Sequence, residues 1–265
     1  MLYLKLVCNE IDFYQNKNQR EINMKLKRYY TNEQLKENLY ITLDGEEFHH
    51  LKNVMRSRVG DMIALFNGST VTAEGEIVSI DKSKASIFIK KVEENPSEPK
   101  INFTLFQAVC KGDKLSLITQ KITEIGATNL CVFYSKFTDI KDKTSKLDKL
   151  ERVSISASKQ CGRSSIIKPQ GVIGFEQMID EAKNLDKVYV AYENKDGNSL
   201  FESLQKQKNI KNIGLIIGAE GGFAEEEIDL LEKNNFEIVT LGKRILRTET
   251  ASIVGTGLVM FALEK

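Results

Sequence analysis

The chain of 265 residues lacks several features that would narrow its function at once. Its four cysteines are widely spaced without a Cys-x-x-Cys pair, and there are only two histidines, which argues against a zinc site and for reduced thiols. No run approaches the roughly 18 apolar residues that a membrane-spanning helix needs. The formal net charge is only +1, so any nucleic-acid site must be a local patch. We therefore expect no metal, no membrane partner and a cytoplasmic location.

Proline is also scarce, and its distribution divides the chain. Two of the three prolines lie in the stretch 94–100, which has the composition of a linker between domains. Met24 is a candidate second start, which makes residues 1–23 a candidate N-terminal extension. We therefore expect a first domain at 24–95 and a second at 101–265.

The first domain has the pattern of short β-strands, rich in β-branched residues and separated by Asp-Gly and Asn-Gly turns. Several short strands joined by hairpins favour a small barrel. The strands are expected at 39–43, 61–66, 70–80 and 85–92, with one short helix at 45–56.

In the second domain strands and helices alternate, which predicts a mainly parallel sheet covered on both faces. In such sheets ligands bind at the carboxyl ends of the strands, so the loops that follow the strands are the expected site. The strands are expected at 101–109, 129–134, 188–191, 213–217 and 236–241. The helices are expected at 112–126, 145–161 and 248–263, with further helices between the later strands.

The first special loop is the glycine-rich run 218–222, which follows the strand at 213–217. Its glycines let backbone amides approach a ligand closely. The next helix should start at about Ala224, and the glutamates in its first turn suit the helix dipole but would repel a phosphate. Neither GxxxxGK[ST] nor GxGxxG is present, so a nucleotide phosphate is disfavoured. The alternative is an ordinary glycine turn that closes a strand–helix unit.

The second special loop follows the strand at 236–241 and is cationic. Lys243, Arg244 and Arg247 come just before a helix, where cations oppose the helix dipole. We infer that an external anion, such as RNA phosphate, interacts with them. The alternative is a solvated turn with a salt bridge to Glu249, a kind of surface pair that contributes little.

These loops carry a family resemblance. IGAEGGF (217–223) followed by LGKRILRTETAS (241–252) resembles the signature of the RsmE family, the small-subunit (16S) ribosomal RNA (uridine-N3) methyltransferases of the SPOUT superfamily. The departures are Ala219, where the family usually has proline, and Ala224, where it often has a capping serine or threonine. The resemblance runs from about residue 24 to the C-terminus. Further motifs that agree in order are KRYY (27–30), HHLKNVMRSRVGDMIALFNG (49–68), QAVCKGDKLSLITQKITEIGA (107–127) and ASKQCGRSSIIKP (157–169).

The resemblance implies an α/β fold with two parts: an N-terminal PUA-like β-barrel that binds RNA and a C-terminal SPOUT α/β domain with a trefoil knot, a rare topology. It also implies a homodimer, and S-adenosylmethionine bound in the knot. The cofactor-binding residues that it implies are Gly218, Glu220, Gly222, Leu241, Gly242, Ile245, Leu246 and Ala251.

The implied reaction sets requirements for the catalytic residues. Uridine N3 carries a proton that must leave before or during attack, and Arg247 or Arg244 could stabilise the developing negative charge. Glu249, or else Glu220, could accept the proton. The target base has to leave its stack to be reached.

The expected partner is small-subunit ribosomal RNA or the assembled 30S subunit. Basic residues interleaved with aromatics suit phosphate contact and base stacking, whereas each single lysine could equally be a solvated surface charge. The candidate RNA-binding residues are Lys27, Arg28, Arg56, Lys111, Gln160 and Arg163.

Two other functions compete with this one. A ribose 2′-O-methyltransferase of the same superfamily is disfavoured because its last motif usually has a Ser-Leu-Asn-Val core. A non-catalytic RNA-binding protein is disfavoured by the intact glycines and the TETAS sequence. The exact uridine, the choice between free RNA and assembled subunit, and the general base stay open.

Overall fold

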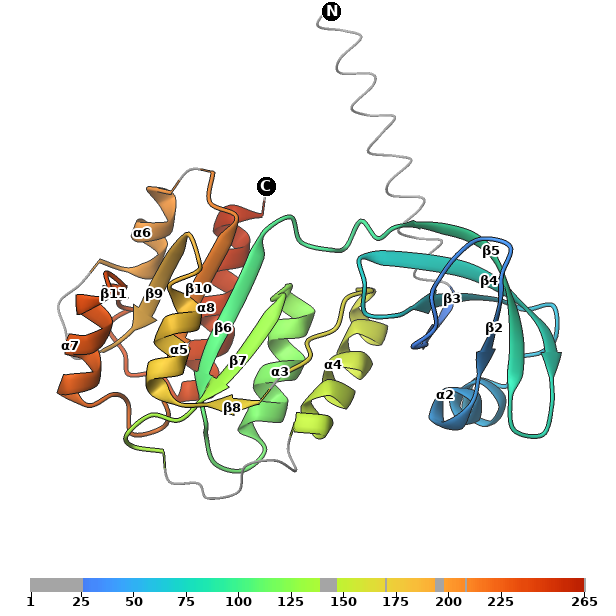
Figure 1. Ribbon diagram of the computed structural model, residues 1–265, viewed down its shortest axis with the longest axis horizontal. Helices are drawn as coiled ribbons and strands as arrows, with labels where there is room; N and C mark the ends of the chain where they lie inside the picture. Colours follow the sequence, from blue (N-terminus) through green and yellow to red (C-terminus); the bar gives the residue numbers. More distant parts are fainter. Residues whose placement is uncertain (1–25, 139–146, 170, 194–197, 208, 265) are drawn as a thin grey trace, which may run out of the picture. The chain divides into compact units, whose positions relative to one another are not determined.

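The chain folds into two compact units in the computed structural model (Figure 1), which describes residues 26–138, 147–169, 171–193, 198–207 and 209–264. The candidate extension at 1–23 lies outside these ranges. The described residues within Met1–Ser97 and Gly162–Ser165 form the first unit, and those within Glu98–Cys161 and Ile166–Lys265 form the second.

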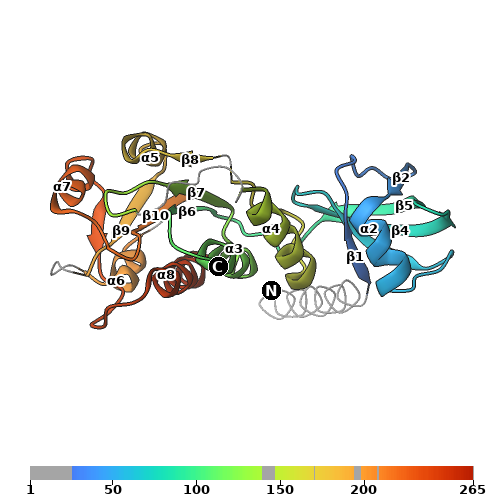
Figure 2. The same cartoon turned by 90° about the horizontal axis from the view of Figure 1, so that it is seen from below.

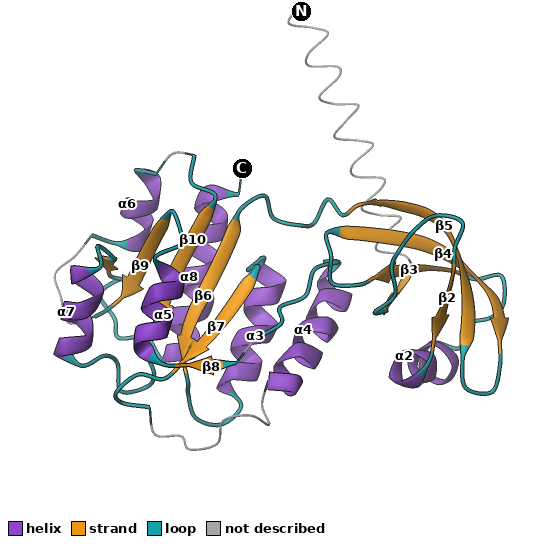
Figure 3. Cartoon of the chain, viewed as in Figure 1, coloured by secondary structure: helices purple, strands orange, loops and turns teal. Residues whose placement is uncertain are grey.

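The first unit is a curled five-stranded sheet, whose strands are orange in Figure 3. The strand order is β1-β3-β4-β5-β2. β1 is parallel to β3, and the other pairs are antiparallel. Alternate residues such as Ile63, Leu65, Ile87 and Ile89 are fully buried in its core, as the period of a half-buried strand requires. The strands are β1 (Lys27–Tyr30), β2 (Tyr40–Leu43), β3 (Met62–Phe66), β4 (Val71–Ile80) and β5 (Ala85–Glu94).

The expected helix at 45–56 differs from the structure. An α-helix, α2 (Gly45–His49), continues as a π-helix, η1 (His50–Val54). The amide of Met55 donates to the carbonyl of His50, five residues back, so the last turn is wider than an α-turn. Arg56 then takes a positive φ of 50°, which ends the helix.

Four residues that follow the linker in sequence, Gly162–Ser165, pack into the first unit. The side-chain amide of Asn95 donates to the carbonyl of Gly162 and the hydroxyl of Ser164, both at 2.8 Å. Arg28 donates to the carbonyl of Arg163 at 2.8 Å. The segment Gly162–Ser165 therefore belongs to the first unit although it follows the linker in sequence.

The second unit contains a six-stranded, wholly parallel sheet in the order β11-β9-β10-β6-β7-β8. The expected parallel sheet is confirmed, with the last strand shorter than expected. Its strands are β6 (Asn102–Ala108), β7 (Asn129–Phe133), β8 (Val172–Ile173), β9 (Lys187–Ala191), β10 (Asn212–Ile217) and β11 (Glu237–Val239). Its helices are α3 (Lys114–Ile125), α4 (Leu147–Cys161), α5 (Phe175–Ala182), α6 (Leu200–Gln205), α7 (Glu225–Lys233) and α8 (Thr248–Leu263).

Helices cover both faces of this sheet (Figure 2). Ile213, Leu215 and Ile217 of β10 face one apolar cluster with residues of α3, α4, α6 and α8. Ile216 faces the opposite cluster, which includes residues of α5 and α7. Because β10 is buried on both faces, its sequence is a nearly continuous run of apolar residues. Among the helices that the structure describes, none has the length and apolar character needed to span a lipid bilayer.

Candidate functional site

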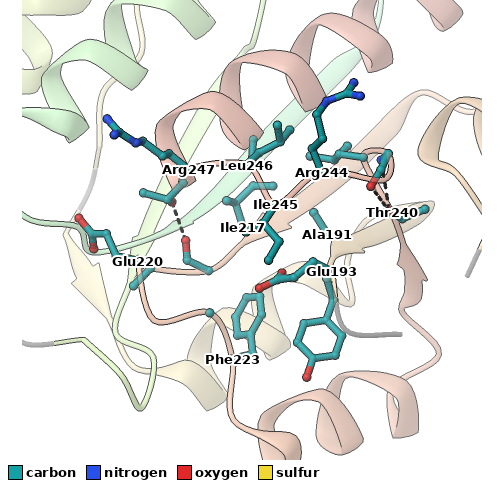
Figure 4. A pocket seen from close by; sticks show the side chains of 18 of the residues that line it. Ala191, Glu193, Ile217, Glu220, Phe223, Thr240, Arg244, Ile245, Leu246 and Arg247 are labelled. Carbon is teal, nitrogen blue, oxygen red and sulfur yellow. Dashed lines mark hydrogen bonds between the residues drawn. The ribbon is translucent and has the colours of Figure 1, made fainter. Parts of the chain in front are cut away.

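A pocket of about 400 Å³ lies at the carboxyl edge of the second unit's sheet. The loops after β9, β10 and β11 and the first turn of α8 form its walls (Figure 4). The residues expected to bind the cofactor all line this one pocket: Gly218, Glu220, Gly222, Leu241, Gly242, Ile245, Leu246 and Ala251. Parallel strands end at a common edge, which explains why loops distant in sequence meet here.

Glycine is required at particular points of the walls. A Cβ added to Gly218 would lie 3.1 Å from the ring of Phe223 and 3.2 Å from the backbone of Gly222, so this close approach leaves little room for a side chain. Gly222 and Gly242 have φ angles of 69° and 118°, in the region that favours glycine. The two loops are therefore shaped by backbone needs that only glycine meets easily.

A buried set of polar side chains holds the two walls together. Gln107, at the end of β6, donates from Nε2 to Thr248 Oγ1 at 3.0 Å, and Thr248 Oγ1 donates to the carbonyl of Gly218 at 2.6 Å. Ser252 Oγ donates to Gln107 Oε1. All three side chains are almost fully buried. This network, Gln107–Thr248–Ser252, links β6, the loop after β10 and the start of α8.

The cations of the second loop lie at the rim of the pocket. Arg244 and Arg247 are exposed, and Figure 4 shows their guanidinium groups directed away from the pocket centre. Neither group has a hydrogen bond or ion pair with another described residue. The salt bridge to Glu249 considered as the alternative is therefore absent from the described part of the chain, and both cations are available to an external anion.

Two carboxylates flank Lys114 beside the same rim. Its Nζ lies 2.8 Å from Glu220 Oε1 and 3.6 Å from Glu249 Oε2. Burial alone would raise the pKa of Glu220, but hydrogen bonds from Lys114 and from the backbone amide of Lys111 outweigh it and lower the pKa. Glu249 Oε2 is buried and accepts no hydrogen bond within the described structure, because 3.6 Å is too long for one. Among the described residues, Glu249 is thus held only by its ion pair with Lys114, and unlike Glu220 it does not line the pocket.

The candidate RNA-binding residues fall into two groups. Lys27, Arg28, Arg56 and Arg163 belong to the first unit, and Lys111 and Gln160 to the second. Arg56, Lys111 and Gln160 are exposed.

The other three have internal contacts. Lys27 Nζ donates to the carbonyl of Met55 at 2.7 Å. Arg28 lies over the ring of Phe66 at 5.2 Å. Arg163 is 3% exposed and donates to Ser165 Oγ. Their charges are thus partly used within the fold.

Three further residues that line the pocket were not among the predicted site residues. Glu193 follows β9 and lines the pocket, as do Phe223 and Thr240. A single glutamate after a strand carries no recognisable motif, and only its position at the sheet's carboxyl edge could have indicated it. Within the described ranges, no cluster of His, Cys, Asp and Glu side chains could hold a metal ion.

A parallel sheet with a glycine-walled pocket and a basic rim, together with a separate β-rich unit, is typical of a cofactor-binding enzyme with an anionic substrate. The protein families that this chain matches are consistent with that class of enzyme. Residues 96–260 match the family model described as an RNA methyltransferase domain, and residues 43–90 match an RNA methyltransferase PUA domain.

Individual relatives agree over nearly the whole chain. Ribosomal RNA small subunit methyltransferase E of Bacillus subtilis is 30% identical, over 90% of this chain and 98% of its own length. Its namesake in Rickettsia conorii is 31% identical, over 87% and 93%. The crystal structure of the Neisseria gonorrhoeae enzyme of that name, bound to S-adenosylmethionine, superposes with a TM-score of 0.81 at 27% identity, covering 89% of this chain and 97% of that one. The chain therefore belongs to the ribosomal RNA small subunit methyltransferase E family, and the resemblance of its motifs is confirmed.

Proposed function

We propose that this protein transfers the methyl group of S-adenosylmethionine to N3 of a uridine in small-subunit (16S) ribosomal RNA. One observation carries the proposal: in a chain of this family, both special loops line one pocket, and the arginines of the second loop stand at its rim. The acceptor is an RNA, and exposed arginines suit its phosphates and the charge that develops on the base.

The pocket residues fit S-adenosylmethionine. Leu241, Gly242, Ile245 and Leu246 offer backbone groups and apolar surface to the adenine, and a Cβ added to Gly242 would meet nothing within 4 Å. Gly218 and the residues after it form the facing wall. The cofactor supplies an electrophilic methyl group when bound. Everything else in the reaction is the task of the protein, chiefly holding the two reactants in line.

The charged residues around the rim have different catalytic roles in this proposal. Arg247, or else Arg244, stabilises the negative charge on the uracil ring as N3 loses its proton. Glu249 accepts that proton in this proposal, and its Oε2, which has no hydrogen bond within the described structure, then gives up its ion pair with Lys114, 3.6 Å away. Glu220 is a poor proton acceptor, since its hydrogen bonds from Lys114 and the Lys111 amide hold its pKa below the usual value despite burial. Lys114 fixes both carboxylates in place.

Substrate binding extends to both units in this proposal. Arg56, Lys111 and Gln160 are exposed and contact the RNA directly. Lys27, Arg28 and Arg163 support the surface of the first unit, through contacts that use part of their donor capacity. The partner is free ribosomal RNA or the assembled 30S subunit, in the cytoplasm.

The finer architecture is also proposed. Residues 24–95 act as a PUA-like β-barrel and 101–265 as a SPOUT domain whose chain passes through a trefoil knot at the pocket. The protein works as a homodimer, with the pocket near the interface. Exposed apolar side chains on α8 support this: Phe261 is 92% exposed and Val254 39% exposed.

The decisive experiment maps modified nucleosides in small-subunit ribosomal RNA from a strain that lacks the gene. We expect 3-methyluridine to disappear from one site and to return when the wild-type gene is restored. A 3-methyluridine that persists, or a lost 2′-O-methyl nucleoside in its place, would overturn the assignment. Adding purified protein and labelled cofactor to RNA from the deletion strain, free or in 30S subunits, then identifies the substrate.

A further inference from the structure

Glu193 brings a carboxylate into the pocket from the loop after β9. Figure 4 shows its side chain extending into the pocket between Ile217 and Phe223. A Cβ added to Gly222 would lie 3.6 Å from Glu193 Oε1, so the carboxylate lies close above the glycine wall. It makes no hydrogen bond or ion pair with another residue in the described part of the chain.

The charges that line the pocket are otherwise unfavourable for a cation. Lys114, Arg244 and Arg247 are positive, and Glu220 is engaged by Lys114. Glu193 is the remaining carboxylate among the described lining residues, and it has no cation of its own. Whereas both arginines point outward, Glu193 points inward. The interior of the pocket is therefore negative and its rim is positive.

The methyl donor and its product differ in charge. S-adenosylmethionine carries a sulfonium, an ammonium and a carboxylate, so it is a net cation, whereas S-adenosylhomocysteine has lost the sulfonium charge and is neutral. In 0.1 M salt a charge is felt over about 10 Å, which is comparable to the dimensions of a pocket of about 400 Å³. A ligand charge that lies within this distance of Glu193 therefore interacts with it.

We propose that Glu193 determines specificity for the charged methyl donor over the uncharged product. This rests on the proposed use of S-adenosylmethionine at this pocket. The carboxylate offsets the repulsion that the arginines exert on the cationic donor. Once the methyl group has been transferred, the sulfonium charge is gone and the carboxylate no longer stabilises the bound ligand. The same residue thus favours donor binding and product release.

The test measures how one substitution changes the affinities for S-adenosylmethionine and for S-adenosylhomocysteine. Glu193→Gln keeps the shape and removes the charge. By calorimetry, the affinity for S-adenosylmethionine should fall roughly fivefold, the effect of a single charge about 8 Å away in a partly solvated pocket, and that for S-adenosylhomocysteine by less than about twofold. In steady-state assays the product should inhibit the variant more strongly, relative to the KM for the donor, than it inhibits the wild type.

The controls separate this role from others. Glu176→Gln removes an exposed carboxylate on α5, away from the pocket, and should leave the ratio of the two affinities unchanged. Raising the salt concentration should reduce the preference of the wild type for the donor but not that of Glu193→Gln. Equal weakening of both ligands would mean that Glu193 binds a group they share, such as the ribose, and would overturn the proposal, as would unchanged affinities. A wild-type protein that binds neither ligand would instead refute the proposed function.

Discussion

Arg247 occupies a position that is unfavourable for folding. It is the N-cap residue of α8, with extended backbone and no capping hydrogen bond from its side chain. A cation at a helix N-terminus costs about 0.3–1 kcal/mol, and here no described residue forms an ion pair with it. Because the fold gains nothing from this guanidinium, its role is more readily explained by the substrate.

Replacing this arginine therefore separates catalysis from stability. We expect Arg247→Ala to reduce methyl transfer by about 10²–10³-fold, the usual effect of removing a donor that stabilises developing charge. The affinity for S-adenosylmethionine should stay within a few fold, and the Tm should be unchanged or slightly higher. Single-turnover assays with labelled donor, calorimetry and thermal unfolding give the three values.

Lys243 provides the matched control for that experiment. It lies in the same loop and is exposed, but it does not line the pocket. Lys243→Ala should keep the rate of methyl transfer within a few fold of wild type. Full activity of Arg247→Ala would remove Arg247 from the active site, and equal losses in both variants would indicate a general electrostatic effect on RNA binding.

At the scale of the elements, the Gln107–Thr248–Ser252 network fixes the distance between the two pocket walls. Gln107 contacts residues 141 and 145 positions away in sequence. It also donates to the carbonyl of Ala108 at 2.9 Å. A single amide thus ties a strand end to a helix start, and the cofactor wall at Gly218 depends on it.

Gln107→Met tests whether this network serves the pocket or only the fold. Methionine keeps the volume but leaves the Ala108 carbonyl and the Thr248 hydroxyl with a lost partner, so the free energy of unfolding should fall by about 1–3 kcal/mol. We also expect a several-fold loss of S-adenosylmethionine affinity with little change in RNA binding. The exposed Gln120 of α3 gives the control Gln120→Met. A variant that melts early yet binds the cofactor as tightly as wild type would limit Gln107 to a structural role.

The helices and strands differ in how far the sequence predicts them. The strands and long helices of the second unit follow from apolar periodicity, and the pocket loops were predictable because parallel strands end at one edge. The π-helix at His50–Val54 and the return of Gly162–Ser165 to the first unit were not. Both features depend on hydrogen bonds whose formation is determined by the packing of the folded chain. The local pattern of apolar and polar residues in the sequence does not indicate them. Gln107 and Glu193 were missed for the same reason, since a lone polar residue in or after a strand has no periodic signal.

At the scale of the whole molecule, α8 is a helix with little charge and much apolar surface. Glu249 is the one charged residue within its range Thr248–Leu263. Phe261 is 92% exposed and Val254 39% exposed on this helix. Exposed apolar surface of this kind is typical of a site for another protein, which is why the proposed homodimer is placed on α8.

Phe261→Glu tests that interface directly. Placing a charge where the aromatic ring would be buried should convert the proposed dimer to a monomer at micromolar concentration, because a buried unpaired carboxylate is strongly disfavoured. Sedimentation velocity measures the mass, and thermal unfolding, which should depend on protein concentration for the wild type, should no longer do so for the variant. Phe201→Glu, on the half-exposed face of α6, is the control and should stay dimeric. Methyl transfer should fall together with dimerisation if the pocket needs the partner subunit. A wild-type protein that sediments as a monomer, or a Phe261→Glu variant that remains a dimer, would move the interface away from α8 or exclude it.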